Sequence, residues 1–443
     1  MPGALLTDLY ELNMAASYLR RGMTEPATFS LFVRKLPSSR GFLVAAGLEA
    51  CLDALETFAF DEDELAYLRT IGFEERDVEA FRALRFDGEV WAIPEGRVVF
   101  ADEPLMEVTA SLPIAQLVET ILLNQVTLHT TVASKAARYR IAAPDAGLVD
   151  FAFRRTHGRE AAMAVARASA IAGFAATSNV EAARRYGLQA AGTMAHSFVE
   201  AFPSEIEAFR AFAQDHPDRT TFLVDTYDTL NGVRAAIDVI RELGLTRGIG
   251  VRLDSGDLDH LSREARRLLD DAGLGDAQIF ASGGLNEMEV ETLVRDGAPV
   301  DAFGIGTQMG VSADAPYIDS VYKLVETGGR PVLKLSAGKA TAPGAKQVWR
   351  GAEGDVLALR DEPPPGEASA PMLEPVMRGG VRIGPAPSLD EMRSRFQTDV
   401  AALTSEVRRL IDPERVEVRH SDALRALTTQ ARDDAILRAG LEP

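Results

Sequence analysis

The sequence predicts an α/β protein whose central part is an irregular barrel of alternating strands and helices. Short apolar runs each end in polar and glycine residues, and amphipathic stretches of helical length separate them. This alternation is typical of strand–helix units around a parallel sheet. In such folds the loops after the carboxyl ends of the strands build the active site. The expected strands are Leu148–Phe153, Leu188–Gly192, Thr221–Val224, Gly248–Leu253, Gln278–Ala281 and Val300–Phe303.

Six strands are too few for a regular eight-stranded barrel, so we expect an irregular one. The segment Gly173–Thr177 is a candidate for a further strand. The expected helices between the strands are Leu230–Leu243, Leu258–Ala272 and Asn286–Asp296. We therefore expect residues 126–315 to form a barrel domain that carries the active site.

The two chain ends predict a second domain of the α+β class. Residues 1–125 mix helices with short strands, and a strand pattern returns after Tyr317. A meander of this kind packs most simply beside the N-terminal strands, so we expect residues 316–443 to join residues 1–125. Two peripheral, charged helices are expected near the C-terminus, at Leu389–Ile411 and Ser421–Ala439.

Composition indicates a globular protein and restricts its partners. The chain has 443 residues and a net charge of −19, which disfavours nucleic acid and anionic membranes as partners. The single cysteine, Cys51, excludes an internal disulfide and a cysteine-based metal cage. The segment Met1–Tyr10 lacks the pattern of a signal peptide, and no apolar run is long enough to span a membrane. We therefore expect a cytoplasmic protein.

Two glycine-containing strand ends are candidates for phosphate binding. Gly304, Gly306 and Thr307 follow one apolar run, and Gly283 and Gly284 follow the preceding one, just before a helix. Unhindered backbone N–H groups and a helix N-terminus favour an anion. The alternative is a pair of tight turns that need positive φ. The spacing of the glycines does not match a dinucleotide-binding fingerprint.

The strand end at Arg252 and Asp254 suits a sugar phosphate. The two residues alternate with Leu253 and share one face of the strand. The cation can hold an anion, while the carboxylate can accept from ribose hydroxyls or hold hydrated magnesium. The alternative is a structural salt bridge. For Asp257 we expect a helix cap.

His196 is the histidine most suited to chemistry, because it lies at a strand end in the segment Gly192–Ser197. A neutral imidazole can act as a base or a nucleophile when a carboxylate orients its other nitrogen. Asp225, at the next strand end, is the expected carboxylate, and Asp228 is its competitor. The alternative is a structural or solvated histidine.

Basic residues in this acidic chain indicate an anionic ligand. Arg154 and Arg155 close the strand that begins at Leu148. Lys135, Arg138 and Arg140 have helical spacing, and for them a solvated helix face is at least as good an explanation.

Taken together, these segments resemble the nicotinate phosphoribosyltransferase family. The similarity spans roughly residues 6–350, with several long motifs in the family's order. It rests on Thr7-Asp8-Leu9-Tyr10-Glu11-Leu12, Asp150-Phe151-Ala152-Phe153-Arg154-Arg155, Gly192-Thr193-Met194-Ala195-His196-Ser197, Val224-Asp225-Thr226-Tyr227-Asp228, Val251–Leu258 and Phe303–Thr307.

The resemblance implies an irregular barrel of the type II phosphoribosyltransferase kind. It also implies ATP-coupled transfer of phosphoribosyl from phosphoribosyl pyrophosphate to nicotinate, giving nicotinate mononucleotide and pyrophosphate in NAD salvage. Mg²⁺, ATP as co-substrate and a homodimer with shared active sites follow from it. His196 matches a histidine that ATP phosphorylates, Asp225 matches its orienting aspartate, and Asp254 would face ribose or magnesium.

The remaining site residues are also implied by the resemblance. Tyr10 matches an aromatic residue that stacks on the pyridine ring across a dimer interface, and Phe151 would cover the other face. Thr193 and Arg252 match nicotinate contacts, and Arg154 matches a cation near the ring and phosphates. The residues expected to hold phosphate are Gly283, Gly284, Gly306 and Thr307.

Ser178 favours nicotinate over nicotinamide as the substrate. The related nicotinamide-using enzyme has an acidic residue at the matching position, and a carboxylate there would repel nicotinate. The alternatives are a nicotinamide or a quinolinate phosphoribosyltransferase, and a catalytically silent member that acts as a binding protein. Quinolinate would need extra basic residues and no phosphorylated histidine, so His196 argues against it.

Overall fold

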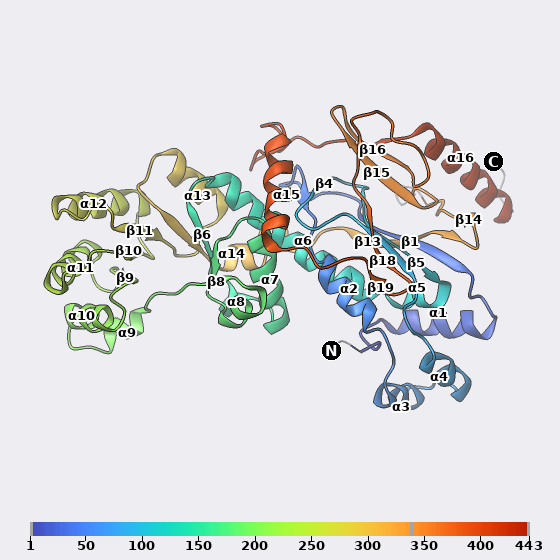
Figure 1. Ribbon diagram of the computed structural model, residues 1–443, viewed down its shortest axis with the longest axis horizontal. Coiled ribbons are helices and arrows are strands. Elements are labelled where there is room, and N and C mark those ends of the chain that lie inside the picture. The colour runs from blue at the N-terminus through green and yellow to red at the C-terminus, as the bar shows by residue number, and fades with distance from the viewer. Residues whose placement is uncertain (1–2, 337–340, 441–443) are drawn as a thin grey trace. The chain divides into compact units, whose positions relative to one another are not determined.

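The computed structural model describes residues 3–336 and 341–440. The chain divides into two compact units, Met1–Thr131 with Tyr317–Pro443, and Val132–Pro316. In Figure 1 the first unit combines the blue N-terminal and the orange to red C-terminal segments, and the second is mainly green and yellow. Among the described residues, no helix has the length and apolar character needed to span a membrane.

The first unit contains a seven-stranded antiparallel sheet to which both chain ends contribute. Strand β1 (Pro26–Val33) lies between β5 (Pro104–Ser111) and β13 (Ser320–Thr327) and pairs with both. The sheet order is β14-β13-β1-β5-β3-β18-β19. The other strands are β14 (Arg330–Pro331), β3 (Glu89–Ala92), β18 (Glu374–Arg378) and β19 (Val381–Arg382).

Two smaller sheets and several helices complete the first unit. The sheets are β17-β15-β16-β20 and β2-β4. Their strands are β2 (Leu43–Val44), β4 (Val98–Val99), β15 (Lys346–Gly351), β16 (Gly354–Leu359), β17 (Ala370–Pro371) and β20 (Arg419–His420). The helices are α1 (Leu9–Arg20), α2 (Leu48–Glu56), α3 (Glu62–Thr70), α4 (Glu75–Arg82), α5 (Leu112–Leu117), α15 (Leu389–Ala402) and α16 (Asp422–Arg438), and α6 (Glu119–Ala142) contributes to both units.

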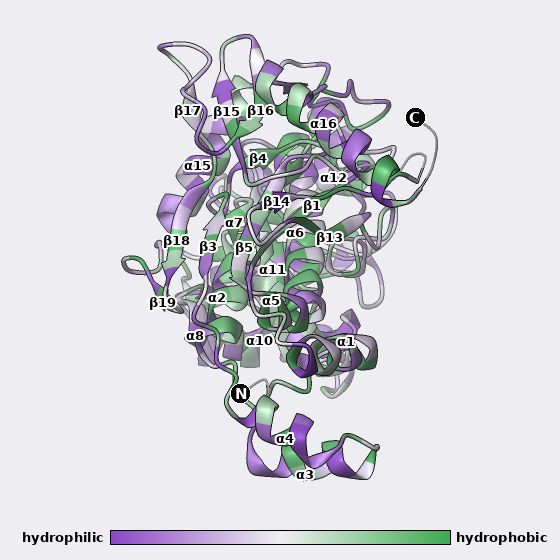
Figure 2. Cartoon of the chain, turned by 90° about the vertical axis from the view of Figure 1, so that its right-hand side faces the viewer, coloured by the Kyte–Doolittle hydropathy of each residue, from purple (hydrophilic) through white to green (hydrophobic). Residues whose placement is uncertain are grey.

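Apolar spacing explains how the helices of the first unit pack. In α1 the buried residues Leu12, Ala15 and Ala16 recur at intervals of three and four, so they form one stripe, and this helix packs on α5. Helices α3 and α4 are mainly hydrophilic, as the purple colouring in Figure 2 shows. Each of them begins with a capping box, which satisfies two of the free N–H groups of its first turn.

The C-terminal helix expected at Leu389–Ile411 is shorter in the structure. Helix α15 ends at Ala402, and Leu403 has an extended backbone. The hydroxyl of Thr404 accepts a hydrogen bond from the backbone N–H of Val407. Such local side-chain bonds compete with helical ones, which explains why the amphipathic pattern overestimates the helix.

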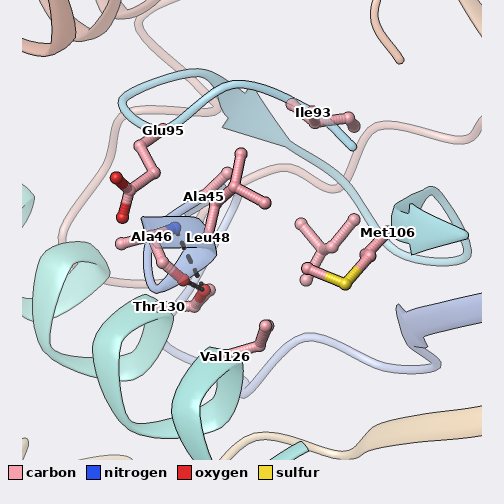
Figure 3. Close-up of a pocket in the computed structure, with 9 residues that line it drawn as sticks. Ala45, Ala46, Leu48, Ile93, Glu95, Met106, Val126 and Thr130 are labelled. Atoms are coloured by element: carbon pink, nitrogen blue, oxygen red, sulfur yellow. Dashed lines mark hydrogen bonds between the residues drawn. The ribbon is translucent and has the colours of Figure 1, made fainter. Parts of the chain in front are cut away.

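A small pocket lies within the first unit (Figure 3). Its lining is largely apolar and includes Ile93, Met106 and Val126. The carboxylate of Glu95 accepts a hydrogen bond from the N–H of Gly47. The cavity holds about one water molecule, so it is too small for an organic substrate.

The second unit is built around a seven-stranded parallel sheet in the order β8-β7-β6-β12-β11-β10-β9. All six expected strands are present, and the seventh strand lies within the candidate segment Gly173–Thr177. The strands are β6 (Gly147–Asp150), β7 (Ala176–Thr177), β8 (Gln189–Ala190), β9 (Thr220–Leu223), β10 (Ile249–Leu253), β11 (Gln278–Ala281) and β12 (Ala302–Ile305).

Helices separate these strands, which confirms the expected irregular barrel. They are α7 (Arg159–Ile171), α8 (Val180–Tyr186), α9 (His196–Glu200), α10 (Glu205–Asp215), α11 (Thr229–Leu243), α12 (Leu258–Asp271), α13 (Glu287–Arg295) and α14 (Thr307–Gly310), with the 3₁₀ helix η1 (Phe153–Arg155). Within the described part of the chain β8 and β9 do not pair, so the barrel stays open there. The segment between these two edge strands contains His196.

Candidate active site

The carboxyl ends of β6, β10 and β11 and the segment before α9 bring several predicted site residues together. Arg252 is the centre of this group. Its Nη2 lies 2.6 Å from Asp254 Oδ1, its Nε lies 2.8 Å from the Ser282 hydroxyl, and its Nη1 lies 3.3 Å from the Thr193 hydroxyl. Three different loops therefore hold this guanidinium group, so its position is fixed before any ligand arrives.

Phe151 supplies an aromatic face beside Arg252. The guanidinium carbon of Arg252 lies 5.2 Å from the centre of the Phe151 ring, within the range of a cation–π contact. The centre of the Phe280 ring lies 5.7 Å from the centre of the Phe151 ring, and the two rings are tilted relative to each other. A side chain at Gly304 would place its Cβ only 2.7 Å from the Phe151 ring, so glycine leaves the space that the ring occupies.

His196 begins α9, and its two ring nitrogens have different surroundings. Nδ1 lies 3.1 Å from the hydroxyl of Thr226. Nε2 lies 4.0 Å from Asp225 Oδ1 and 3.9 Å from Asp254 Oδ2, which are ion-pair rather than hydrogen-bond distances. The side chain is 42% exposed. His196 therefore presents Nε2 to a region with two carboxylates, while Nδ1 is engaged.

Asp225 combines deep burial with one unused oxygen. Its side chain is only 1% exposed. Oδ2 accepts from the backbone N–H of Asp254 at 3.2 Å and from the hydroxyl of Ser255 at 2.5 Å. Oδ1 has no hydrogen-bond partner within the described residues. Since a buried carboxylate oxygen without a partner is costly, this atom indicates a place for a cation or a donor.

The other two aspartates of these loops begin helices. Asp228 Oδ1 accepts from the backbone N–H of Asn231 at 2.9 Å at the start of α11. Asp257 Oδ1 accepts in the same way from the N–H of His260 at 3.1 Å at the start of α12, which confirms the expected cap. Both side chains are N-caps, so Asp228 stabilises the start of α11.

The two glycine loops differ in why they need glycine. Gly283 and Gly284 have φ values of 108° and 83°, and a Cβ at Gly283 would overlap the backbone oxygen of Asp254. The explanation by positive φ therefore applies to this loop. Gly306 has φ −112° and precedes α14, whose first residue, Thr307, is exposed. Both loops leave backbone accessible to solvent.

Three predicted residues take no part in the contacts described around Arg252 and His196. Ser178 is half-buried, and its N–H donates to the backbone oxygen of Asp150 at 2.8 Å. Arg154 is exposed on η1. Tyr10 belongs to the first unit, where it is 47% exposed on α1, and burial together with Glu119 and Glu11 raises the pKa of its hydroxyl.

The structure adds polar residues to which the sequence assigned no role. Thr226 and Ser255 directly follow predicted site aspartates, and Ser282 precedes the glycine pair, so their positions were the available signal. Glu205 is a fourth addition. Its carboxyl oxygen Oε1 is buried without a hydrogen-bond partner in the described chain, and burial with Asp228 and Asp225 raises its pKa to about 7.

The solvated helix face suggested for Lys135, Arg138 and Arg140 is wrong. Lys135 and Arg138 are only 1% and 4% exposed and form ion pairs with Glu287. Arg140 donates to backbone oxygens, among them that of Gly173 at 2.8 Å. Long basic side chains at helical spacing can be solvated at the surface or can pair with a buried carboxylate. Only the fold distinguishes the two cases.

No group of three or more histidine, cysteine, aspartate or glutamate side chains in residues 3–336 and 341–440 forms a metal cage. The predicted magnesium residue Asp254 shares the space near His196 Nε2 with Asp225. Two carboxylates suit Mg²⁺, which usually keeps several waters and takes its other ligands from substrate phosphates. The donor set therefore fits a magnesium ion that arrives with a phosphorylated substrate.

Comparison with known proteins gives one consistent result. Family models described as the N-terminal domain, the family itself and the C-terminal domain of nicotinate phosphoribosyltransferase match residues 5–127, 146–348 and 368–428. A nicotinate phosphoribosyltransferase of Mycobacterium tuberculosis is 48% identical over 418 residues, covering 93% of this chain and 89% of the relative. The enzyme of the same name from Bacillus subtilis is 40% identical over 452 residues, covering 94% and 92%.

Solved structures agree with these relatives. The crystal structure of human nicotinic acid phosphoribosyltransferase matches with a TM-score of 0.85 and 31% identity, covering 96% of this chain and 99% of that one. The nicotinate-nucleotide pyrophosphorylase of Pyrococcus furiosus has the same fold, with a TM-score of 0.75, 24% identity and coverage of 90% and 95%. The chain therefore belongs to the nicotinate phosphoribosyltransferase family.

Proposed function

We propose that the protein transfers the phosphoribosyl group of phosphoribosyl pyrophosphate to nicotinate and couples this transfer to ATP hydrolysis. The products are nicotinate mononucleotide and pyrophosphate. The observation that carries the proposal is the group around Arg252, in which a fixed cation, an aromatic face and two carboxylates lie beside His196. Family membership supports the same reaction.

Arg252, Thr193 and Phe151 are the proposed contacts of nicotinate. A guanidinium group binds a carboxylate by charge-assisted hydrogen bonds, and an aromatic ring stacks on a pyridine ring. Arg252 already lies against the Phe151 ring, so the two contacts can act on one ligand. Arg154 adds positive charge after β6, and the uncharged Ser178 adds no negative charge at its position.

The transfer step needs no general base. The lone pair of the pyridine nitrogen attacks the anomeric carbon of the ribose, the bond to the pyrophosphate oxygen breaks, and both electrons leave with pyrophosphate. Positive charge develops on the ribose ring, and Asp254 can stabilise it. The proposed phosphate contacts are the backbone N–H groups of Gly283, Gly284 and Gly306 and the hydroxyl of Thr307.

His196 is the proposed acceptor of the γ-phosphate of ATP. Its Nδ1 donates a hydrogen bond to the hydroxyl of Thr226 in the tautomer that leaves a lone pair on Nε2. Nε2 attacks phosphorus, the bond to ADP breaks, and water later cleaves the phosphorus–nitrogen bond. The phosphorylated ring carries positive charge, which Asp225 and Asp254 stabilise at about 4 Å from Nε2.

Asp225 and Asp254 are the proposed magnesium-binding residues. Oδ1 of Asp225 lacks a partner, and Oδ2 of Asp254 is left free by Arg252, which binds the other oxygen. A bound Mg²⁺ would neutralise phosphate charge and stabilise the leaving oxygen. The residues themselves fix the place of that charge relative to His196.

We also propose a homodimer in which Tyr10 reaches the active site of the second copy. Tyr10 and its neighbours Leu6 and Leu9 are about half exposed, at 47%, 55% and 56%. Three large apolar side chains so close in sequence form a surface suited to a protein partner.

The proposal is tested with the purified protein, phosphoribosyl pyrophosphate and nicotinate, with and without ATP and Mg²⁺. Chromatography should detect nicotinate mononucleotide and pyrophosphate in equal amounts, with a higher rate when ATP is present. Mass spectrometry should detect an acid-labile phosphate on the peptide that contains His196. Absence of nicotinate mononucleotide under all these conditions would refute the proposed reaction.

A further inference from the structure

Two buried cations on the part of α6 in the second unit connect the segments that follow β11 and β12. Lys135 Nζ lies 2.5 Å from Glu287 Oε2 and 2.7 Å from Asp314 Oδ1. Arg138 Nε lies 2.6 Å from Glu287 Oε1. The side chains of Lys135 and Glu287 are 2% and 3% exposed. Buried charges are tolerated when they are paired, so these contacts restrict where the attached segments can lie.

The first of these segments is the loop Ser282–Asn286 between β11 and α13 (Figure 1). Glu287 is the first residue of α13, directly behind the loop. The hydroxyl of Tyr139, one turn along α6 from Lys135, donates to the backbone oxygen of Leu285 at 3.0 Å. Three side chains of α6 therefore hold the C-terminal end of this loop.

The N-terminal end of the same loop is held by residues of the candidate active site. The hydroxyl of Ser282 binds Arg252 and Asp254. Between these two ends lie Gly283 and Gly284, which have no side chains that could pack and fix the backbone. The conformation of the glycine pair thus depends on the anchors at its two ends.

The second segment follows β12 and contains Thr307 and the short helix α14. The backbone N–H of Ala313 donates to the oxygen of Gln308 at 3.0 Å, so residue 314 is tied to α14. Asp314 then binds the same ammonium group that binds Glu287. One side chain, Lys135, therefore joins both glycine-containing segments.

We propose that Lys135 is a positioning residue that sets the spacing between the two phosphate-binding loops. It acts through Glu287 and Asp314 and does not touch substrate, because its ammonium group is buried between these carboxylates. The inference rests on the proposed function, in which these loops hold the phosphates of phosphoribosyl pyrophosphate. Burial raises the pKa of the Glu287 carboxyl, but Lys135 and Arg138 outweigh burial and lower it overall, so the carboxylate is charged at neutral pH.

The test is the variant Lys135→Met, which keeps the bulk of the side chain and removes its charge. The KM for phosphoribosyl pyrophosphate should rise about ten- to a hundredfold, since small displacements of positioning groups have effects of this size. The KM for nicotinate, whose proposed contacts are Arg252, Thr193 and Phe151, should stay unchanged. Lys135→Arg restores the charge and should recover part of the affinity. Calorimetry with inorganic pyrophosphate as the probe should reproduce the loss.

Asp314→Ala tests the same idea with less risk to folding. Asp314 is 29% exposed, and its removal leaves the ion pair of Lys135 with Glu287 intact. The link from Lys135 to the second loop is lost, so the KM for phosphoribosyl pyrophosphate should rise by a smaller factor. This variant decides the question if Lys135→Met does not fold.

Lys346→Met is the matched control for loss of a buried lysine. Lys346 Nζ lies 3.0 Å from Glu107 Oε1 in the first unit, with side chains 3% and 0% exposed. It should lower Tm as Lys135→Met does, with no change in either KM. The inference is wrong if Lys135→Met and Asp314→Ala leave the KM for phosphoribosyl pyrophosphate unchanged, or raise both KM values together. A wild-type protein that makes no nicotinate mononucleotide would instead refute the proposed function.

Discussion

Single residues of the candidate site are held by several loops at once. Arg252 bonds to side chains from three different strand ends, and Asp225 is fixed by Asp254 and Ser255. Preorganised charges of this kind need little rearrangement when a ligand binds, which favours catalysis of charge-developing reactions. Substitutions here should therefore change individual steps of the reaction.

His196→Ala should abolish ATP hydrolysis and leave slow, uncoupled formation of nicotinate mononucleotide. The reason is that the pyridine nitrogen attacks without help from the imidazole, whereas the proposed phosphoryl transfer needs Nε2 of His196 as its acceptor. The measurement follows ADP and nicotinate mononucleotide in the same reaction. Thr226→Val is the companion variant, because it removes the hydroxyl at Nδ1 and should slow phosphorylation. Full ATP turnover in His196→Ala would exclude the histidine from the mechanism.

Ser178→Asp should shift specificity from nicotinate towards nicotinamide. The new carboxylate repels the acid and can accept hydrogen bonds from the amide. One charge-assisted hydrogen bond is worth about 1.5–3 kcal/mol, so the ratio of kcat/KM for the two substrates should change by about ten- to a hundredfold. Ser178→Asn is the uncharged control. An unchanged ratio in Ser178→Asp would show that this position does not set specificity.

At the scale of elements, the loop between β11 and α13 contains one position that requires glycine for two reasons. Gly283 needs both a positive φ and the absence of a Cβ, whereas Gly284 needs only the positive φ. The backbone N–H groups of this loop are the proposed phosphate donors, so its exact path matters for binding.

Gly283→Ala should therefore weaken binding of phosphoribosyl pyrophosphate more than Gly284→Ala does. The first variant pushes the loop away from the Asp254 backbone, and the second adds only backbone strain, of about 1–3 kcal/mol. The measurement is the KM for phosphoribosyl pyrophosphate in both variants, with Tm as a check on folding. Equal effects of the two substitutions would contradict the role of the close contact.

Elements and strand ends of the second unit could be predicted from the sequence because their signals are local. Apolar runs and the polar residues after them place Arg252, Asp254, His196 and Asp225 at one sheet edge. Contacts that depend on the fold could not be predicted. The hydroxyl of Thr226 at His196, and the burial of Lys135 against Glu287, arise from segments far apart in sequence. The shortened helix α15 shows a third limit, since amphipathic spacing continues past the point where local side-chain bonds end the helix.

At the scale of the whole molecule, the proposed shared active site can be tested by mixing two impaired variants. Tyr10→Ala should raise the KM for nicotinate about tenfold, the loss of roughly 1–1.5 kcal/mol of stacking. Arg252→Ala should inactivate the site by removing the residue that the other subunit contributes to it. After mixing and subunit exchange, each mixed dimer has one site with both native residues, so roughly a quarter of all sites should regain wild-type behaviour. Mixed dimers that form without any gain in activity would exclude a shared site.

The antiparallel sheet of the first unit also has a consequence for the synthesis of the chain. Strands β1 and β5 leave the ribosome early, but β13, which pairs with the other edge of β1, follows only after the entire second unit. The second unit is continuous in sequence and can fold while the nascent chain waits for its last strands. Until β13 emerges, β1 presents an unpaired edge rich in apolar residues, which is a template for aggregation. Ribosome pausing or premature termination before Ser320 should therefore yield chains that depend on chaperones, although their second unit is already complete.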